Sequence, residues 1–274
     1  MDVDIGVIYT YEDHFMSPLI SSLARSGEEI GMRLILVDNA SEHGVAPWSR
    51  QFEETLVLRN GERLGYAENL NRILEQSTAR YTLLLNTDMV FEPAEQCVAK
   101  MVQFMDRHSD CGVSGCRLFH ADGSYAWPAR RFQSLKTIAA RRLGMSRLLA
   151  GEVQSYLYAD LPQDQLLECD WLSGCFLMVR REAVAAVGSL DCRFRKYFED
   201  VDFCLRMARG GWKVLLNGET FGYHLEQRAS RKLLSRDGWL HMQSYWKWLR
   251  KWGFDPARHL AAGNRTAAAM ARTN

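Results

Sequence analysis

Short runs of apolar and β-branched residues alternate with amphipathic stretches along the first part of the chain. The apolar runs at residues 5–10, 33–37, 55–58 and 81–85 predict buried strands, because they are short and rich in branched side chains. Apolar residues at helical spacing predict helices over residues 17–26, 67–76 and 93–107. This alternation is typical of an α/β fold with a mostly parallel central sheet flanked by helices.

The pattern changes in the second half. Residues 117–168 carry scattered apolar side chains among arginines, and we interpret them as a partly helical excursion from the sheet. Strands are expected again over residues 171–180 and 213–216, and helices over residues 182–187 and 201–209. We therefore predict one α/β domain over residues 1–231 and a helical C-terminal tail over residues 232–274.

Polar clusters directly follow three of the predicted strands. Ligands of open α/β sheets bind beyond the carboxyl ends of the strands, so these clusters should converge on one crevice of a nucleotide-binding type. The residues are Thr10, Tyr11 and Glu12 after the first strand, Asp38 and Asn39 after the second, and Asn86, Thr87 and Asp88 after the fourth.

Composition and charge narrow the function classes. The chain has 274 residues, of which 47% are hydrophobic, so it can bury a large core. Its formal net charge of +1 lacks the basic excess of proteins that grip a duplex, and we expect no nucleic-acid partner. We find neither a signal-peptide pattern nor an apolar run of the roughly 18 residues that a membrane span needs. A cytoplasmic location, peripheral at most to the inner face of a membrane, is therefore expected.

The cysteines indicate reduced thiols. Seven are present and no pair has CxxC spacing, which argues against a zinc knuckle or a thioredoxin-like site. We expect all of them to act as small buried hydrophobic residues.

Asp88 is a candidate ligand for a hard divalent cation, because a carboxylate at a strand end can hold such an ion through oxygen. The cation would neutralise a diphosphate leaving group. The alternative is a plain turn or capping role, since aspartate is common in turns.

Three acidic residues, Glu199, Asp200 and Asp202, stand where a helix is expected to begin. Acids in a first helical turn stabilise the helix dipole, which is the alternative to a catalytic role. Asp202 is spaced to pair with Arg206 one turn later. Glu199 and Asp200 then remain for chemistry, and a carboxylate there could take a proton from an attacking hydroxyl group.

His224 follows the last predicted strand. Its neutral imidazole is a competent metal ligand, although a lone histidine is more often structural. Arg228, Ser230 and Arg231 follow it and could bind phosphate oxygens, or they could form an exposed basic loop.

Taken together, these segments resemble the family 2 glycosyltransferases. The matching pieces, in chain order, are VIYTYED, LVDNAS, RLGYAENLNRI, YTLLLNTDMVFEP, WLSGCFLMVRREAVAAVGSLD, YFEDVDFCLRMARGGWKVLL and YHLEQRAS, and they extend to about residue 231. The stretch DGSYAWPARRFQSL and the run from SGCFLMVRR to YFEDVDFCLR are similar to the rhamnosyltransferase-like branch. The resemblance implies the Rossmann-like GT-A fold, with residues 117–168 near the acceptor site.

The resemblance also implies roles for the reacting groups. Asp200 matches the catalytic base, and Glu199 beside it would orient the base or bind the acceptor. Asp88 matches the last acid of the metal-binding DxD motif, where Asn86 replaces the first acid. His224 would complete the site for Mg²⁺ or Mn²⁺.

The remaining roles concern the substrates. Trp171 and Gly174 would flank the acceptor and the donor sugar. Arg63 stands where the family usually has asparagine, which puts its role in doubt. Residues implied in binding the nucleotide and the donor are Thr10, Tyr11, Glu12, Asp38, Asn39, Arg63, Asn71, Asn86 and Thr87.

The implied function is inverting transfer of a sugar from a nucleotide-diphosphate donor, with dTDP-rhamnose as one candidate. The acceptor would be a glycan or a polyprenyl-linked saccharide in cell-surface polysaccharide synthesis. One alternative is a nucleotidyltransferase that forms nucleotide sugars, but VIYTYEDHF lacks a glycine-rich basic phosphate loop. Another is a non-catalytic sugar-nucleotide-binding subunit, which the presence of both Asp88 and Asp200 disfavours.

The tail carries aromatic and basic residues on a predicted helix: Trp239, Trp246, Lys247, Trp248, Arg250, Lys251 and Trp252. Such a helix could lie at a membrane interface, or its tryptophans could pack it onto the main domain. Helical spacing does not separate these alternatives, because both need one apolar face. The sequence leaves the oligomeric state open, and a homodimer stays among the hypotheses.

Overall fold

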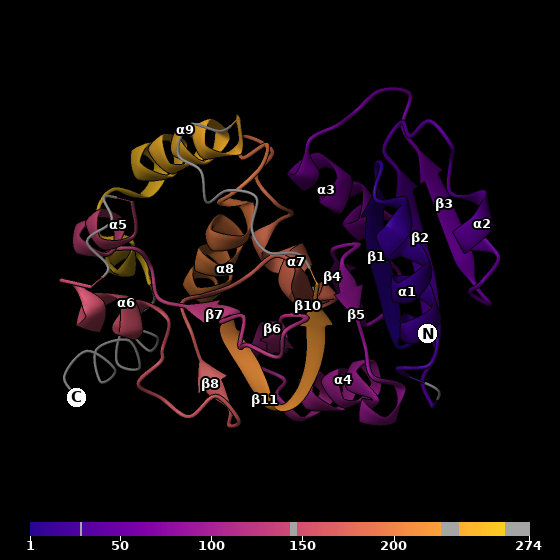
Figure 1. Ribbon diagram of the computed structural model, residues 1–274, viewed down its shortest axis with the longest axis horizontal. Coiled ribbons are helices and arrows are strands. Elements are labelled where there is room, and N and C mark those ends of the chain that lie inside the picture. The colour runs from indigo at the N-terminus through magenta and orange to yellow at the C-terminus, as the bar shows by residue number, and fades with distance from the viewer. Residues whose placement is uncertain (28, 143–146, 226–235, 261–274) are drawn as a thin grey trace.

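The computed structural model of the chain describes residues 1–27, 29–142, 147–225 and 236–260. Within these residues, nine strands form one central sheet with helices on both faces (Figure 1). The expected α/β architecture is therefore confirmed.

The N-terminal half of the sheet is wholly parallel. Its order is β3 (Thr55–Arg59), β2 (Met32–Asp38), β1 (Val3–Tyr9) and β4 (Tyr81–Leu85). Each of these strands is a short run of branched or leucine side chains, which suits a strand covered on both faces.

The second half is mixed. Strand β10 (Phe176–Arg180) runs antiparallel to β4 and to β6 (Cys111–Phe119), and β6 pairs in parallel with β11 (Lys213–His224). The short strands β5 (Met89–Val90) and β8 (Leu167–Glu168) pair antiparallel with β11. Strand β10 runs antiparallel to both of its neighbours, so β4 and β6 run in the same direction. The carboxyl ends of β1, β2, β4, β6 and β11 therefore all lie at one edge of the sheet.

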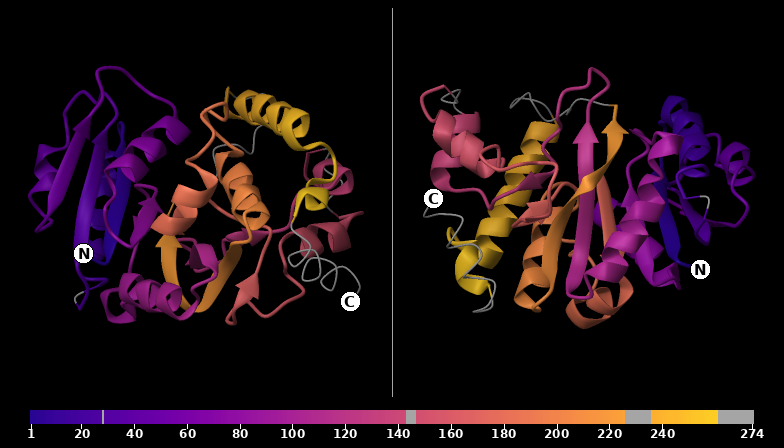
Figure 2. Two further views of the ribbon diagram at one scale, coloured as in Figure 1. Left: turned by 180° about the vertical axis from the view of Figure 1, so that it is seen from behind. Right: turned by 90° about the horizontal axis from the view of Figure 1, so that it is seen from below.

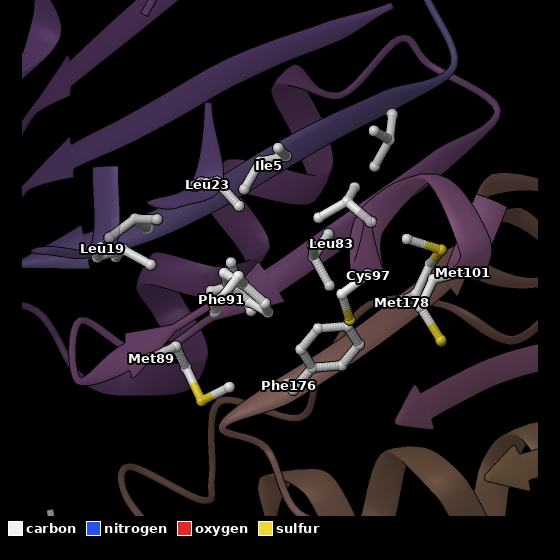
Figure 3. Packing of buried hydrophobic residues seen from close by; sticks show 14 of the residues in the cluster. Ile5, Leu19, Leu23, Leu83, Met89, Phe91, Cys97, Met101, Phe176 and Met178 are labelled. Carbon is white, nitrogen blue, oxygen red and sulfur yellow. The ribbon is translucent and has the colours of Figure 1, made fainter. Parts of the chain in front are cut away.

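The two faces of the sheet bury separate cores. Helices α1 (Asp13–Leu23) and α4 (Cys97–Arg107) cover one face, where Ile5, Leu83 and Met178 pack against them (Figure 3). Helices α3 (Tyr66–Gln76), α7 (Arg181–Val187) and α8 (Glu199–Arg209) cover the other face. Alternate residues of each strand supply the two cores, as the period of a strand requires.

Gly6 of β1 allows α3 to approach the sheet closely. A β-carbon at this position would lie 2.3 Å from a methyl carbon of Ile73. Any larger residue would therefore push α3 away, together with the loop that precedes it.

The tail helix α9 (Arg236–Trp252) packs against α8. Its Trp248 and Trp252 are buried with Phe198 in the second core. The carboxylate of Asp202 joins the helices, because it accepts hydrogen bonds from Trp252 Nε1 at 2.7 Å and from Arg206 Nε at 2.9 Å, and lies 2.6 Å from Lys251 Nζ. The expected pairing of Asp202 with Arg206 is confirmed.

The remaining described elements are short and lie outside the main sheet. Helices α5 (Leu135–Arg142) and α6 (Ala150–Tyr156) contact each other, and β7 (Ala129–Arg130) pairs with β9 (Trp171–Leu172). The others are α2 (Ala46–Ser49), η1 (Pro93–Glu95) and η3 (Pro256–His259). Two further views show β6 and β11 side by side in the middle of the molecule, with α5 and α6 at the end away from β3 (Figure 2).

Three expectations need correction. Strand β6 was not expected, and its last residues fall inside the segment interpreted as an excursion. The strand expected over residues 171–180 is two strands, β9 and β10, separated by a turn at Ser173–Cys175. The strand expected over residues 213–216 continues to His224.

The thiol expectation also needs one correction. All seven cysteines are free and six are buried, but Cys192 is exposed. Among the described residues, no helix has the length and apolar character needed to cross a bilayer.

Candidate active site

The first part of the candidate site is a set of loops that Asn39 holds together at the carboxyl ends of β1 and β2. Its side-chain nitrogen donates to Thr10 Oγ1 at 3.4 Å and to the carbonyl of Leu64 at 3.3 Å. Its side-chain oxygen accepts from Leu64 N at 2.9 Å and from Asn60 Nδ2 at 2.8 Å. The amide is fully engaged, so Asn39 fixes the relative positions of three loops.

Asp38 is buried beside Asn39. Its Oδ1 accepts a hydrogen bond from Ser41 N at 2.9 Å, while a β-carbon at Gly44 would lie 3.8 Å from its Oδ2. Gly44 has φ +70°, a left-handed conformation that favours glycine. The loop is therefore shaped to keep space beside the second carboxylate oxygen.

The loop after β1 is held by Glu12. Its Oε2 accepts hydrogen bonds from Thr10 N at 3.1 Å and Tyr11 N at 3.0 Å. The side chain of Tyr11 is exposed, as is that of Arg63 in the turn before α3. Asn71 lies further along α3, where its amide donates to the carbonyl of Leu190 and accepts from Leu190 N, both at 2.8 Å.

Asp88 and His224 meet at the junction of the two sheet halves. Asp88 Oδ2 lies 3.0 Å from His224 Nε2, and both side chains are largely buried. The pairing of β5 with β11 places Met89 opposite His224, and Leu225 N donates to the carbonyl of Asp88 at 2.9 Å. A ring nitrogen of His120 lies 3.3 Å from the carbonyl of His224 and supports its backbone.

The Asp88–His224 pair suits a divalent cation by its chemistry. A carboxylate oxygen and an imidazole nitrogen are both ligands that Mn²⁺ and Mg²⁺ accept. Within the described part of the chain, no group of three or more His, Cys, Asp and Glu side chains is arranged to hold a metal. Phosphate oxygens and water are further ligands that such a cation accepts.

Tyr66 links the two halves of the site. Its hydroxyl group lies 2.8 Å from Asn86 Oδ1 and 3.2 Å from the carbonyl oxygen of Gly174. Burial, followed by the charges of Glu199, Cys175, Asp200 and Asp88, raises the pKa of Tyr66 well above its usual range. A neutral Tyr66 therefore connects the loop of Asp88 with the loop of Gly174.

Asp200, the second residue of α8, contacts Gly174. Its Oδ2 accepts a hydrogen bond from Gly174 N at 3.0 Å, and its Oδ1 accepts from Val201 N at 2.8 Å. Burial raises the pKa of Asp200, although these hydrogen bonds and the charge of Arg130 offset part of the rise. A β-carbon at Gly174 would lie 3.4 Å from the Asp200 carboxylate, so glycine keeps this position uncrowded.

Glu199 is more deeply buried than Asp200. It is 6% exposed, and its Oε2 is buried without a hydrogen-bond partner. Burial and then the charge of Asp200 raise the pKa of Glu199 well above its usual range. Of the two neighbours, Asp200 is the one that ionises first and can act as a base.

The backbone before α8 is strained. Tyr197 and Phe198 both have φ +70°, a left-handed conformation that bulky residues rarely adopt. The packing of Phe198 with Tyr245 and Trp248 of α9 holds this conformation in place. Tertiary packing therefore fixes the direction in which Glu199 and Asp200 enter the site.

Trp171 supports this region as a buried side chain. It is 6% exposed, its Nε1 donates to the carbonyl of Arg131 at 2.9 Å, and the guanidinium group of Arg130 lies 4.8 Å from its ring centroid. Arg130 thus covers Trp171. The predicted phosphate-binding residues Arg228, Ser230 and Arg231 lie outside the described residues.

The structure connects several of the residues that the sequence singled out. Asp88 contacts His224, Asn86 contacts Tyr66, and Tyr66 in turn contacts Gly174, whose N–H donates to Asp200. Tyr66 lies in one of the segments that resemble the family, but no role was predicted for it. The only available signal was its place at the start of a helix that follows a predicted strand end.

A pair of side chains suited to a divalent cation and a buried pair of carboxyl groups nearby are suited to the transfer of a group from a phosphate-linked leaving group. Residues 5–188 match the family described as glycosyl transferase family 2, and the chain belongs to this family.

Similar proteins agree with this assignment. The chain is 27% identical to N-acetylglucosaminyl-diphospho-decaprenol L-rhamnosyltransferase of Mycobacterium tuberculosis, over 96% of this chain and 81% of that protein. It is also 27% identical to rhamnosyltransferase WbbL of Escherichia coli, over 30% of this chain and 31% of that protein.

Solved structures of glycosyltransferases share the fold. The mannosyltransferase PcManGT from Pyrobaculum calidifontis, in complex with GDP-Man and Mn²⁺, is 15% identical, with a TM-score of 0.57 over 99% of this chain and 76% of that chain. GalNAc-T7 with UDP, GalNAc and Mn²⁺ is 12% identical, with a TM-score of 0.65 over 99% of this chain and 54% of that chain. At this identity the likeness concerns the fold alone, and it confirms the GT-A expectation.

Proposed function

We propose that this protein is a metal-dependent inverting glycosyltransferase that moves a sugar from a nucleotide-diphosphate donor to a saccharide acceptor. The observation that carries the proposal is the connection of two groups of side chains: Tyr66 contacts Asn86, two residues before Asp88 of the Asp88–His224 pair, and Gly174, which binds Asp200. Inversion by single displacement needs a base and a cation site within one site, because the attacking hydroxyl group and the leaving diphosphate lie on opposite sides of the anomeric carbon.

Asp200 is the proposed base. Its ionised carboxylate takes the proton of the acceptor hydroxyl group as that oxygen bonds to the anomeric carbon and the bond to the diphosphate breaks. Mg²⁺ or Mn²⁺ held by Asp88 and His224 would supply positive charge to the leaving diphosphate. Asp38 and the loop of Thr10 are proposed to bind the nucleoside, where Asn39 orders the loops.

The rhamnosyltransferase relatives support a finer proposal for the substrates. The mycobacterial relative, whose name specifies an L-rhamnosyl donor and a prenyl-diphosphate-linked N-acetylglucosamine acceptor, matches 96% of this chain. We infer a rhamnosyl donor such as dTDP-rhamnose and a polyprenyl-diphosphate-linked saccharide acceptor in cell-surface polysaccharide synthesis.

A membrane-bound acceptor agrees with the outer face of α9. Trp239 and Trp246 are 66% and 62% exposed and stand two turns apart, so they share a face, with exposed Lys247 and Arg250 nearby. We propose that this face contacts an anionic bilayer. Trp239→Ala combined with Trp246→Ala should abolish sedimentation with phosphatidylglycerol vesicles. Unchanged sedimentation of the double variant would contradict the contact.

The homodimer stays a prediction, which light scattering of the pure protein tests.

The proposed function is tested by the products formed from dTDP-rhamnose with Mn²⁺, with and without a saccharide acceptor. Transfer, and slow release of dTDP without acceptor, are expected. Asp200→Asn should lower kcat by about a thousandfold, within the range of general-base catalysis, while dTDP affinity changes little. Asp88→Ala should weaken Mn²⁺-dependent dTDP binding in calorimetry.

Other products would identify the alternatives. Pyrophosphate formation would indicate a nucleotidyltransferase. A folded protein that binds no nucleoside diphosphate would favour a non-catalytic subunit. Near-normal turnover of Asp200→Asn would show that Asp200 is not the base.

A further inference from the structure

Five partly exposed aromatic rings gather near the carboxyl ends of β6 and β11. The two strands pair in parallel with Phe119 opposite Tyr223 and Arg117 opposite Phe221, so these four side chains emerge on one face. The ring centroids of successive neighbours lie 4.9–6.5 Å apart. The rings belong to Phe119, Tyr125, Trp127, Phe221 and Tyr223.

One end of this aromatic cluster adjoins the proposed metal side of the site. Tyr223 directly precedes His224, and His120 directly follows Phe119. The ring of His120 lies 6.4 Å from the ring of His224 and contacts its backbone carbonyl. The backbone of the cluster therefore borders His224, although the rings of Tyr223 and His224 face opposite sides of the sheet, as successive residues of a strand do.

The other end adjoins the proposed base. Trp127 directly precedes Pro128, whose carbonyl oxygen accepts a hydrogen bond from Ser173 N at 2.9 Å. Gly174, the residue after Ser173, donates its own N–H to Asp200. Residues 119–130 thus run from the histidine side of the site to the base side.

Trp127 has an unusual backbone conformation. Its φ is +51°, a left-handed value that is costly for a bulky residue and occurs mainly where the surrounding structure enforces it. Its ring packs edge-on against Tyr125, with centroids 4.9 Å apart and planes 85° apart. Unlike Trp171, which is buried beneath Arg130, Trp127 keeps part of its ring exposed.

We propose that Trp127, braced by Tyr125, is the stacking platform for the acceptor's sugar ring, an inference that rests on the proposed function. One face of a hexose presents mainly C–H groups, which are attracted to the electron-rich face of an indole ring, and its hydroxyl groups remain free for polar partners. A sugar on Trp127 would lie next to the segment that connects through Ser173 and Gly174 to Asp200, the proposed base for the acceptor hydroxyl group. The acceptor-binding role expected for Trp171 then becomes indirect, through support of Arg130.

The test measures acceptor binding separately from chemistry. A soluble probe, N-acetylglucosamine diphosphate carrying a short farnesyl chain, is titrated calorimetrically into the full-length protein with dTDP and Mn²⁺. Trp127→Ala and Trp127→Leu should each weaken probe binding by about tenfold, as loss of about 1.4 kcal/mol implies. Trp127→Phe should bind within about threefold of the native protein, because it keeps an aromatic face.

Two controls separate a binding role from a folding role. Phe254→Ala removes another exposed aromatic residue, 67% exposed and outside the site, and should bind the probe as the native protein does. Release of dTDP from dTDP-rhamnose without acceptor should be unchanged in every Trp127 variant, which shows that the donor side is intact.

The outcomes distinguish this inference from the proposed function. Native-like probe binding by Trp127→Leu would overturn the platform, as would a failure of the native protein to bind the probe while it still releases dTDP. If dTDP is not released at all but probe binding depends on Trp127, the platform stands and the proposed reaction fails.

Discussion

At the scale of single residues, the site contains two adjacent carboxyl groups in different environments. Glu199 is buried and its Oε2 has no hydrogen-bond partner, whereas both oxygens of Asp200 accept backbone hydrogen bonds. Two adjacent carboxyl groups whose environments separate their pKa values are common where acid–base chemistry occurs. Burial raises the pKa of Glu199 and so favours its protonated form.

This difference predicts how stability changes with pH. Because the pKa of Glu199 is raised in the folded chain, the folded state keeps a proton that the unfolded state has released, and stability falls as the pH rises above the unfolded value of about 4.3. The slope approaches about 1.4 kcal/mol per pH unit until the folded pKa is reached. Glu199→Gln should reduce this slope in urea unfolding measured between pH 5 and 8, and the remainder would come from Asp200, whose pKa burial also raises.

The exposed Glu182 provides the matched control, since Glu182→Gln should follow the native pH dependence. Native and Glu199→Gln curves that run parallel across this pH range would rule out a protonated Glu199. Glu199→Gln should also retain most transfer activity, because glutamine resembles the neutral acid.

Tyr66 predicts a second effect at this scale. Tyr66→Phe removes the hydroxyl group that contacts Asn86 and Gly174, so the two loops keep their backbone hydrogen bond from Asn86 N to the carbonyl of Cys175 but lose the side-chain link. We expect kcat to fall about tenfold while the donor KM stays within about twofold, because the lost contact positions groups rather than binding the donor. Steady-state kinetics at saturating acceptor measures both constants.

Tyr81→Phe is the matched control for Tyr66→Phe. The hydroxyl group of Tyr81 donates to Asp106 Oδ1 at 2.6 Å, and Tyr81 lies at the end of β4 away from the site. A similar fall in kcat in both variants would mean that Tyr66 acts only through general stability.

At the scale of elements, α8 and α9 are joined by one buried carboxylate. Asp202 is fully buried and contacts Arg206, Lys251 and Trp252. Asp202→Asn would leave two cationic groups without their carboxylate, and we expect it to cost about 3 kcal/mol of unfolding free energy. Urea unfolding at pH 7 measures this loss.

Asp191→Asn offers a comparison that involves the same lysine of α9, from the loop before α8. Asp191 also pairs with Lys251 but lies nearer the surface, so its loss should cost about 1 kcal/mol or less. Equal losses of unfolding free energy in Asp191→Asn and Asp202→Asn would contradict the central role of Asp202.

The sequence predicted the elements whose pattern is local. Strands β1 to β4 are short apolar runs and were expected close to their observed bounds. Strand β6 was missed because Gly112, Ser114 and Gly115 interrupt its apolar pattern. Gly112 is needed for packing, since a β-carbon there would lie 2.7 Å from Cβ of Trp212. Small residues chosen for tertiary packing leave no periodic signal.

The same distinction applies to the site. Asp38, Asp88 and Asp200 could be singled out because strand ends and a helix start indicate where ligands bind. The contacts of Tyr66 with Asn86 and Gly174 join residues 20 and 108 positions away in sequence. The burial of Glu199 likewise depends on packing between distant segments. Neither feature could be predicted from local pattern.

At the scale of the whole molecule, the tail is part of the second core. Trp248 and Trp252 pack with Phe198, although the sequence placed the tail outside the main domain. We therefore propose that the described chain unfolds as one cooperative unit. Urea unfolding followed by far-ultraviolet circular dichroism and by tryptophan fluorescence should give coincident transitions. An early separate fluorescence transition would indicate that α9 folds independently.

The order of strands in the sheet has a consequence for how such enzymes can diversify. The loops proposed for the nucleotide lie within residues 1–90, whereas the base and the aromatic cluster lie beyond residue 110. The two parts meet through the register of β4 with β10, the pairing of β5 with β11 and the hydroxyl group of Tyr66. A single genetic crossover near η1 that preserves those three contacts would join the donor preference of one parent to the acceptor preference of another.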